Sequence, residues 1–168
     1  MHNSRGTTHV VFNGEIYNYK SLRSELESLG HRFTSSSDTE SIIAAYDEWG
    51  AGCVEKLDGM FAFALWSDDH DELLLARDRF GKKPLYIWQQ DGELIFGSEI
   101  KCLLVDERVE RKINQEAVAE YLQYRYVPWP NTLFQDIEKL PPASYAIWKN
   151  GRMSECTPLL RSARSRTA

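Results

Sequence analysis

The chain has 168 residues, 42% of them hydrophobic, and a formal net charge of -5 at pH 7. This is enough for one domain with a single core, and the acidic balance argues against nucleic-acid or anionic-membrane partners, which attract clustered Lys and Arg. An odd number of widely spaced cysteines favours a reducing, cytoplasmic setting, and no apolar run approaches the ~20 residues of a membrane span or forms a signal peptide.

A short strand and a helix are predicted first along the chain. Residues 9–12 read as the strand, and it leads into a turn at Asn13-Gly14. Apolar residues at helical spacing over 19–29 then predict a helix, and Gly30 stands where a C-terminal glycine cap belongs.

A second helix is predicted from a capping signal. Ser37 and Glu40 make an S-x-x-E capping box, apolar residues follow over 42–49, and Gly50 ends the helix. Asp38 therefore lies in the first helical turn, where the helix dipole favours a carboxylate. That interpretation, a helix-stabilising acid, stands beside any functional role for Asp38.

The middle of the chain is predicted to be mainly β-structure. Residues 60–66 and 73–76 are apolar on both faces, so both strands need cover on both sides. A hairpin is expected over 85–96, with its turn at Gln90-Asp91-Gly92. A short helix is expected at 98–104.

The last predicted elements are a helix and a hairpin. Asn114 is a plausible N-cap for a helix that carries Val118, Tyr121 and Leu122, and Asn150-Gly151 marks a hairpin turn. We expect the domain to cover residues 1–153. Residues 154–168 end in a stretch with three arginines and no apolar periodicity, so they are predicted to be a disordered tail.

The most specific signal is a set of motifs in a fixed order. Asn-Gly alone is weak, because it is also a common hairpin turn. The set as a whole resembles the amidotransferase half of glutamine-dependent asparagine synthetases over about residues 9 to 150. The main runs are Phe12 to Tyr19, Ser37 to Glu40, Leu57 to Trp66, Arg77 to Tyr86, Phe96 to Lys101 and Tyr126 to Pro128.

The resemblance implies an α+β fold, a four-layer αββα sandwich of two antiparallel sheets of the N-terminal nucleophile hydrolase type. It implies that L-glutamine is the substrate and that the Asn13 amide and the Gly14 N–H form an oxyanion hole. Asp38 would hold the substrate α-ammonium, and Glu15 would also line the substrate site. In the family the ammonia passes to a synthetase domain that uses ATP and Mg²⁺; no cofactor and no metal site are expected in this chain.

Two departures from the family pattern limit this reading. The opening Cys nucleophile and the Arg-Gly-Pro-Asp motif have no counterpart before His9, and the ATP-binding motif has none after Met153. We therefore expect a domain truncated at both ends, incomplete in fold and inactive alone. Cys53 and Cys102 read as small buried hydrophobes and Cys156 falls in the tail, so none is expected to replace the nucleophile.

Several alternatives remain open. The chain could be a degenerate, non-catalytic binding module whose missing strands come from a partner chain, or the amidotransferase part for another acceptor. An unpaired edge beside residues 9–12 would also favour homo-oligomers. Finally, the charged residues Arg77, Asp78, Arg79, Lys82 and Glu99 could be catalytic in an unknown enzyme, or could form a buried ion-pair network that braces a loop.

Overall fold

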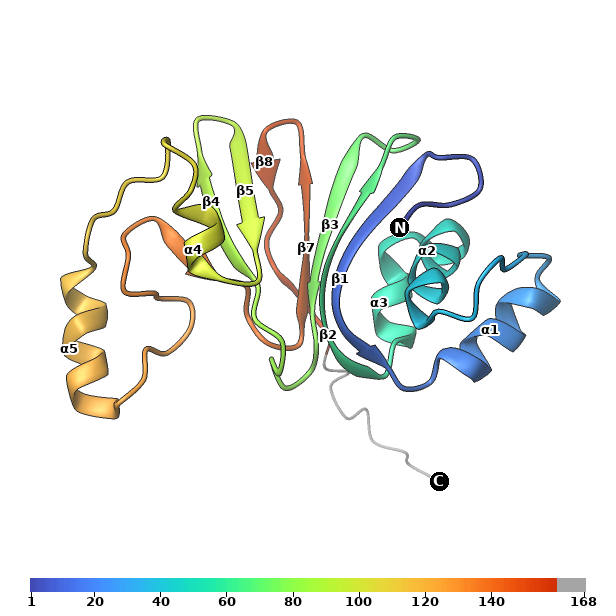
Figure 1. Ribbon diagram of the computed structural model, residues 1–168, viewed down its shortest axis with the longest axis horizontal. Helices are drawn as coiled ribbons and strands as arrows, with labels where there is room; N and C mark the ends of the chain where they lie inside the picture. Colours follow the sequence, from blue (N-terminus) through green and yellow to red (C-terminus); the bar gives the residue numbers. More distant parts are fainter. Residues whose placement is uncertain (160–168) are drawn as a thin grey trace, which may run out of the picture.

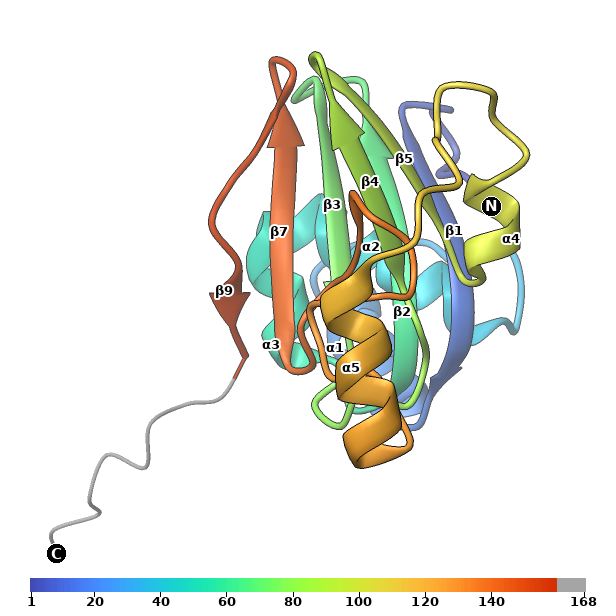
Figure 2. The ribbon, with the colours of Figure 1, turned by 90° about the vertical axis from the view of Figure 1, so that its left-hand side faces the viewer.

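The computed structural model describes residues 1–159 of the chain. Its elements stack in four layers (Figures 1 and 2): three helices, a large sheet, a small sheet, and two further helices on the outer side of the small sheet. The αββα arrangement predicted from the resemblance is therefore present. No helix of residues 1–159 is long and apolar enough to cross a membrane.

The large sheet is antiparallel, in the order β1-β2-β3-β7-β8, with β9 also paired to β7. Alternate residues of β2 supply its two cores: Phe61 and Phe63 pack toward the helices, and Ala62 and Ala64 toward the small sheet. This confirms that the central strands are covered on both faces. The strands are β1 (Thr8–Ile16), β2 (Gly59–Ser67), β3 (Glu72–Arg77), β7 (Ser144–Lys149), β8 (Arg152–Met153) and β9 (Thr157–Pro158).

The small sheet has the order β5-β4-β6 and faces the large sheet across an apolar layer. Its hairpin turns at Asp91 and Gly92, which both have positive φ, as expected for a tight two-residue turn. The strands are β4 (Tyr86–Gln90), β5 (Glu93–Gly97) and β6 (Ile137–Lys139). The helices are α1 (Tyr19–Ser28), α2 (Asp38–Trp49), α3 (Cys53–Lys56), α4 (Ile100–Leu103) and α5 (Gln115–Tyr124), with a 3₁₀ turn at Gly50–Gly52.

The helix ends follow the predicted signals in one case and depart from them in another. After α1, Gly30 has φ +100°, and the amides of Gly30 and His31 bond back to Glu27 and Leu26, so the glycine cap is confirmed. At α2, Ser37 Oγ accepts from Thr39 N at 3.2 Å. Glu40 does not return to Ser37, however, so the reciprocal half of the predicted capping box is wrong.

Strand β1 is longer than predicted. It runs to Ile16 in unbroken register with β2, so Asn13-Gly14 lies within a strand and the predicted turn there is wrong. The reason is that β2 is equally long and pairs with β1 to its end. On the other side of β1, Met1 and Val10 exchange two backbone hydrogen bonds of 2.8 and 2.9 Å. The first part of this outer edge is therefore paired.

Ordered structure continues past residue 153. The hairpin β7-β8 turns at Asn150 and Gly151 as predicted. Beyond it, Thr157 pairs with Tyr145 in β7, and Leu159 is buried and bonds through its amide to Ala143 O at 2.7 Å. The expected tail therefore does not begin at 154; its remaining part, 160–168, lies outside the described residues.

Candidate functional site

The N–H of Gly14 faces the outer edge of β1. Residues of the same parity along a strand point their backbone groups to the same side. Val10 N bonds outward to Met1 O, and Ile16 N bonds outward to the Asp38 carboxylate. Gly14 lies an even number of residues from both, so its N–H also points outward. Within residues 1–159 its N–H makes no hydrogen bond outside the β1–β2 ladder. A backbone donor is thus available to a ligand at this edge.

Only glycine fits at position 14. Its φ is +151°, and a Cβ built there would lie 2.1 Å from Met60 O and 2.7 Å from Phe61 Cα. Gly59 is pressed against the same strand, because its Cβ would lie 2.2 Å from Glu15 O. The two backbones approach more closely than side chains allow. The position of the Gly14 N–H is therefore fixed by the β2 backbone.

Asn13 lies on the face of β1 that is turned away from the helices. Val10 and Ile16 belong to the core under α1 and α2, and strand alternation places Asn13 on the opposite face. There its cross-strand partner is Ala62, which belongs to the layer between the sheets. Asn13 is half-buried at the rim of this layer. Its amide thus stands next to the edge at which the Gly14 N–H emerges.

Asp38 is brought to the same edge from the helical layer. It opens α2, and its Oδ2 accepts the Ile16 N–H at 2.9 Å, only two residues beyond Gly14. The carboxylate is thus used by a strand rather than by the amides of its own helix. Among residues 1–159 no N–H or O–H group donates to its Oδ1. One oxygen fixes the carboxylate beside the edge, and the other is available.

The loop before Asp38 is held by Glu40. Its carboxylate accepts the backbone amides of Thr34 and Ser35, each at 2.7 Å, and both side-chain hydroxyls. Burial alone would raise the pKa of Glu40. The hydrogen bonds from Ser35 and Thr34 together outweigh burial, so the pKa of Glu40 is below its ordinary value. The sequence pattern predicted Glu40 as part of a capping box but did not indicate that it orders this loop.

The four predicted site residues are therefore gathered at one end of β1. Asn13, Gly14 and Glu15 are consecutive in the strand, Glu15 is exposed, and Asp38 bonds to the next residue along. The larger cavities described below are lined by other residues. The role of the four residues in binding remains a prediction.

The charged run after β3 is a backbone clamp and not the predicted ion-pair network. The guanidinium of Arg77 donates to the carbonyls of Gly81, Lys83 and Leu140 at 2.7 to 2.8 Å, and burial lowers its pKa. Arg79 donates to Leu57 O at 2.7 Å. The bracing role is present, but these side chains act on backbone carbonyls and not on opposite charges. Glu99 is apart, in an exposed pair with Lys101.

The cysteines of the described part offer no activated thiol at the β1 edge. Cys53 is fully buried, and burial raises the pKa of its thiol to about 12. A thiol with such a pKa is almost wholly protonated near neutral pH, so it is a poor nucleophile. Cys102 is exposed, so its expected burial is wrong; α4 packs against the small sheet through Leu103 and Ile100 instead.

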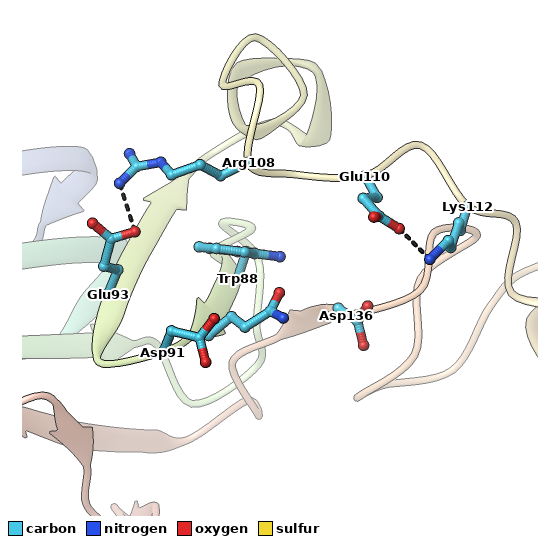
Figure 3. A pocket seen from close by; sticks show the side chains of 8 residues that line it. Trp88, Asp91, Glu93, Arg108, Glu110, Lys112 and Asp136 are labelled. Carbon is cyan, nitrogen blue, oxygen red and sulfur yellow. Dashed lines mark ion pairs between the residues drawn. The ribbon is translucent and has the colours of Figure 1, made fainter.

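A charged cavity of about 400 Å³ lies on the small sheet (Figure 3). Arg108 pairs with Glu93 at 2.7 Å, and Lys112 pairs with Glu110. These pairs are exposed, so they are strongly screened and contribute little. Two further cavities, about 540 and 370 Å³, lie beside the α1–α2 loop and beside residues 126–129.

Comparison with known proteins places this architecture. Two solved structures share the fold: the glutamine phosphoribosylpyrophosphate amidotransferase of B. subtilis, and a structure described as the allosteric regulatory enzyme of purine biosynthesis. Their TM-scores are 0.61 and 0.65 at 18% identity, and the likeness covers 96% of this chain and 31% and 30% of theirs. The fold is therefore the amidotransferase αββα sandwich of the N-terminal nucleophile type, as the resemblance implied.

Sequence comparison defines the family. The glutamine amidotransferase domain matches residues 1–158, and this chain belongs to that family. Among its relatives are asparagine synthetase [glutamine-hydrolyzing] 1 of Bacillus subtilis, 42% identical over 80% of this chain and 21% of the relative, and asparagine synthetase [glutamine-hydrolyzing] 3 of Arabidopsis thaliana, 46% identical over 63% of this chain and 18% of the relative. The chain thus spans about a fifth of the length of these relatives.

Proposed function

We propose that this chain binds L-glutamine along the outer edge of β1 and is the amidotransferase part of an asparagine-synthetase type of enzyme. One observation carries the proposal: the Gly14 N–H faces an open edge, beside a carboxylate that Ile16 holds in place. Family membership and the names of the relatives support the choice of glutamine. The ammonia would then serve the synthesis of asparagine.

Each residue has a distinct chemical task in this proposal. The Gly14 N–H and the Asn13 side-chain amide donate to the oxygen of the glutamine side-chain amide, on which negative charge develops during acyl transfer. Donors fixed in advance in this way are typically worth ~3 kcal/mol each in the barrier. Asp38 Oδ1 accepts from the α-ammonium, and Glu15 adds negative charge nearby. Neither ATP nor Mg²⁺ is needed for this binding step.

A binding experiment tests the site. We expect glutamine, added to the ¹⁵N-labelled chain, to move the amide resonances of Asn13, Gly14 and Ile16. Asp38→Asn removes the charge opposite the α-ammonium, so it should weaken glutamine binding by about tenfold. Asp136→Asn, an exposed turn carboxylate on the small sheet, is the matched control and should bind as the wild type does. Glutamine-induced shifts confined to other residues would reject the site.

Hydrolysis is expected to need a cysteine from outside residues 1–159. The buried thiol of Cys53 is protonated, and the resemblance assigns the nucleophile to an N-terminal Cys with a free α-amine. The purified chain should therefore release glutamate no faster than buffer, because such catalytic units lose nearly all their rate enhancement without the nucleophile. Turnover that disappears in Cys53→Ala or Cys102→Ala would reassign the nucleophile.

A synthetase domain is the partner that this proposal requires, and an exposed aromatic surface supports its docking site. We define the α5 surface as Tyr121, Leu122, Tyr124, Tyr126 and Trp129, which are 47% to 72% exposed at the end of the molecule away from α1–α3 (Figure 1). Exposed apolar patches of this kind mark interaction sites. The cavity beside residues 126–129 adjoins the α5 surface and is also lined by Pro142. The next residue, Ala143, accepts a hydrogen bond from the amide of Leu159.

Footprinting would test this docking site. Residues 1–158 would replace the matched segment of the B. subtilis asparagine synthetase 1, and the oxidation of tyrosine and tryptophan would be compared with that of the isolated chain. We expect Tyr126 and Trp129 to be protected in the larger protein. Tyr17, which is 57% exposed near the end of β1, is the control for Tyr126 at 62%. Equal oxidation of Tyr126 in both proteins would remove the α5 surface from the proposal.

The same glutamine site would also suit an enzyme that passes ammonia to another acceptor, because in this proposal the acceptor binds in a separate domain and not at the outer edge of β1. It would also serve a module that binds glutamine without hydrolysing it. Restoration of growth without asparagine by the chimaera just described would favour asparagine synthesis. Glutaminase activity of that chimaera without asparagine formation would favour another acceptor.

A further inference from the structure

The carboxylate of Asp78 is fully buried and joins two separate parts of the chain. Its Oδ1 accepts the backbone amides of Phe80 and Lys82 at 2.9 and 3.1 Å, in the loop after β3. Its Oδ2 accepts the amides of Lys83 and Phe61 at 3.1 and 3.2 Å. Phe61 is in β2, so this carboxylate links the loop to the central strand.

Within residues 1–159 no basic side chain pairs with Asp78. A buried carboxylate that forms no direct ion pair is costly unless hydrogen bonds solvate it, and here four peptide N–H groups do so, with the charge of the Arg77 guanidinium nearby. Arg77 binds the same loop through the carbonyls of Gly81 and Lys83 but makes no bond to β2. Arg79 anchors the loop to Leu57, so of these three side chains only Asp78 reaches the strand that touches Gly14.

Asp78 also extends the ladder between β2 and β3 by one step. The paired residues of the two strands end at Ala62 and Arg77. Beyond them, Asp78 N donates to Phe61 O at 2.8 Å while Phe61 N donates to the carboxylate. Phe61 lies directly across from Gly14, with its Cα only 2.7 Å from where a Gly14 side chain would start. A shift of Phe61 therefore moves the surface against which Gly14 rests.

We infer that Asp78 is a positioning residue for the glutamine site: it fixes the Phe61 backbone and thereby sets the position of the Gly14 N–H at the edge of β1. This inference rests on the function proposed above. It gives a buried carboxylate 64 residues along the chain from Gly14 a role in substrate binding without contact with substrate. A catalytic oxyanion hole depends on such support, because donors misplaced by a fraction of an ångström lose most of their effect.

The test compares two variants of neighbouring residues. Asp78→Asn replaces one accepting oxygen by an NH₂ group that faces backbone N–H donors. It loses either the bonds from Phe61 and Lys83 or those from Phe80 and Lys82, and in both orientations donor–donor repulsion displaces the side chain that holds Phe61. Arg77→Met breaks three bonds to carbonyl groups but none to β2, and it is the control for loss of stability alone. Melting temperature, the amide shift of Gly14 and the dissociation constant for glutamine would be measured for both.

We expect both variants to melt at lower temperature, and only Asp78→Asn to move the Gly14 resonance and weaken glutamine binding by about tenfold. Arg77→Met should keep the Gly14 resonance and bind glutamine within about twofold of the wild type. Equal effects of the two variants on Gly14, or no movement of Gly14 in Asp78→Asn, would overturn the inference.

Two further measurements keep the outcome clear. If Asp78→Asn does not fold, Asp78→Glu retains the charge but displaces it by one methylene, and it should still shift Gly14; an unmoved Gly14 would again overturn the inference. If the wild type binds no glutamine, the proposed function fails, and the positioning role is decided by the Gly14 resonance alone.

Discussion

Helices α2 and α5 carry similar start signals and similar apolar stripes, yet their surroundings are opposite. In α2 the side chain of Ser37 caps the first turn, and Ile42, Ile43 and Tyr46 are buried against the large sheet. In α5 the side chain of Asn114 caps the first turn, but Ala117 is the one buried residue of the helix and Leu122 is 72% exposed. A stripe at helical spacing shows that a face needs cover, and not whether the same chain supplies it.

This contrast divides the molecule into a half whose apolar side chains are covered by its own core and a half that leaves apolar side chains exposed. The β1–α2 half contains the site residues and is closed by its own core, apart from the outer edge of β1 after Val10. The α5 half leaves aromatic side chains in water. We expect substitutions in the first half to act on stability and glutamine binding, and substitutions on the α5 surface to act on association.

The largest effect is expected from Gly14→Ala. A Cβ at 2.1 Å from Met60 O cannot be accommodated without separating β1 from β2. Overpacking together with the positive φ should cost about 4 kcal/mol of unfolding free energy and abolish glutamine binding. Gly30→Ala is the control: its φ is +100°, but no heavy atom lies within 4 Å, so about 1 kcal/mol is expected. Urea unfolding measures both, and equal losses would show that β1 tolerates the displacement.

Next in size is Ile42→Ala in α2. Its side chain is fully buried, and removing it leaves a cavity in the core under the large sheet. A loss of about 3 kcal/mol in unfolding free energy is expected. A loss below about 1 kcal/mol would mean that this half is loosely packed, against the contrast drawn above.

A smaller effect is expected from Glu40→Gln. The folded pKa of Glu40 lies below its ordinary value of 4.5. The stability that its ionised form contributes is therefore fully present above that value and is lost as the pH falls through the lower folded pKa. Amide exchange of Thr34 and Ser35 should rise in that acid range in the wild type, relative to its intrinsic rate. In Glu40→Gln it should be raised already at pH 7 and change little on acidification; protection that is independent of pH in the wild type would refute the role of Glu40.

The smallest effect on stability is expected from Leu122→Ala on α5. Because this side chain lies in water, the unfolding free energy should change by no more than about 0.5 kcal/mol. In the footprinting chimaera, in contrast, the same substitution should weaken the protection of Tyr126. A loss of 2 kcal/mol or more in the isolated chain would show that the α5 surface is covered in solution.

The local sequence determined most of the secondary structure. Runs that are apolar on both faces specified β2 and β3, glycine caps ended α1 and α2, and paired turn residues specified the two hairpins, since each of these signals acts within a few residues. The Asn13-Gly14 and Asp38 motifs also identified the candidate site, through their resemblance to a family. The sequence did not show that β1 continues through Gly14, because that depends on the length of a partner strand more than 40 residues away.

Tertiary structure alone decided which polar groups share an environment. The bond from Ile16 to Asp38 and the link from Asp78 to Phe61 join segments that the chain order keeps apart. Even over five residues, the fold decided that Glu40 bonds the loop before α2 and not Ser37. It also decided that the apolar stripe of α5 stays exposed while that of α2 is buried. The physical reason is that a hydrogen bond or a burial depends on what lies opposite in space, whereas a periodic pattern records only which residues share a face.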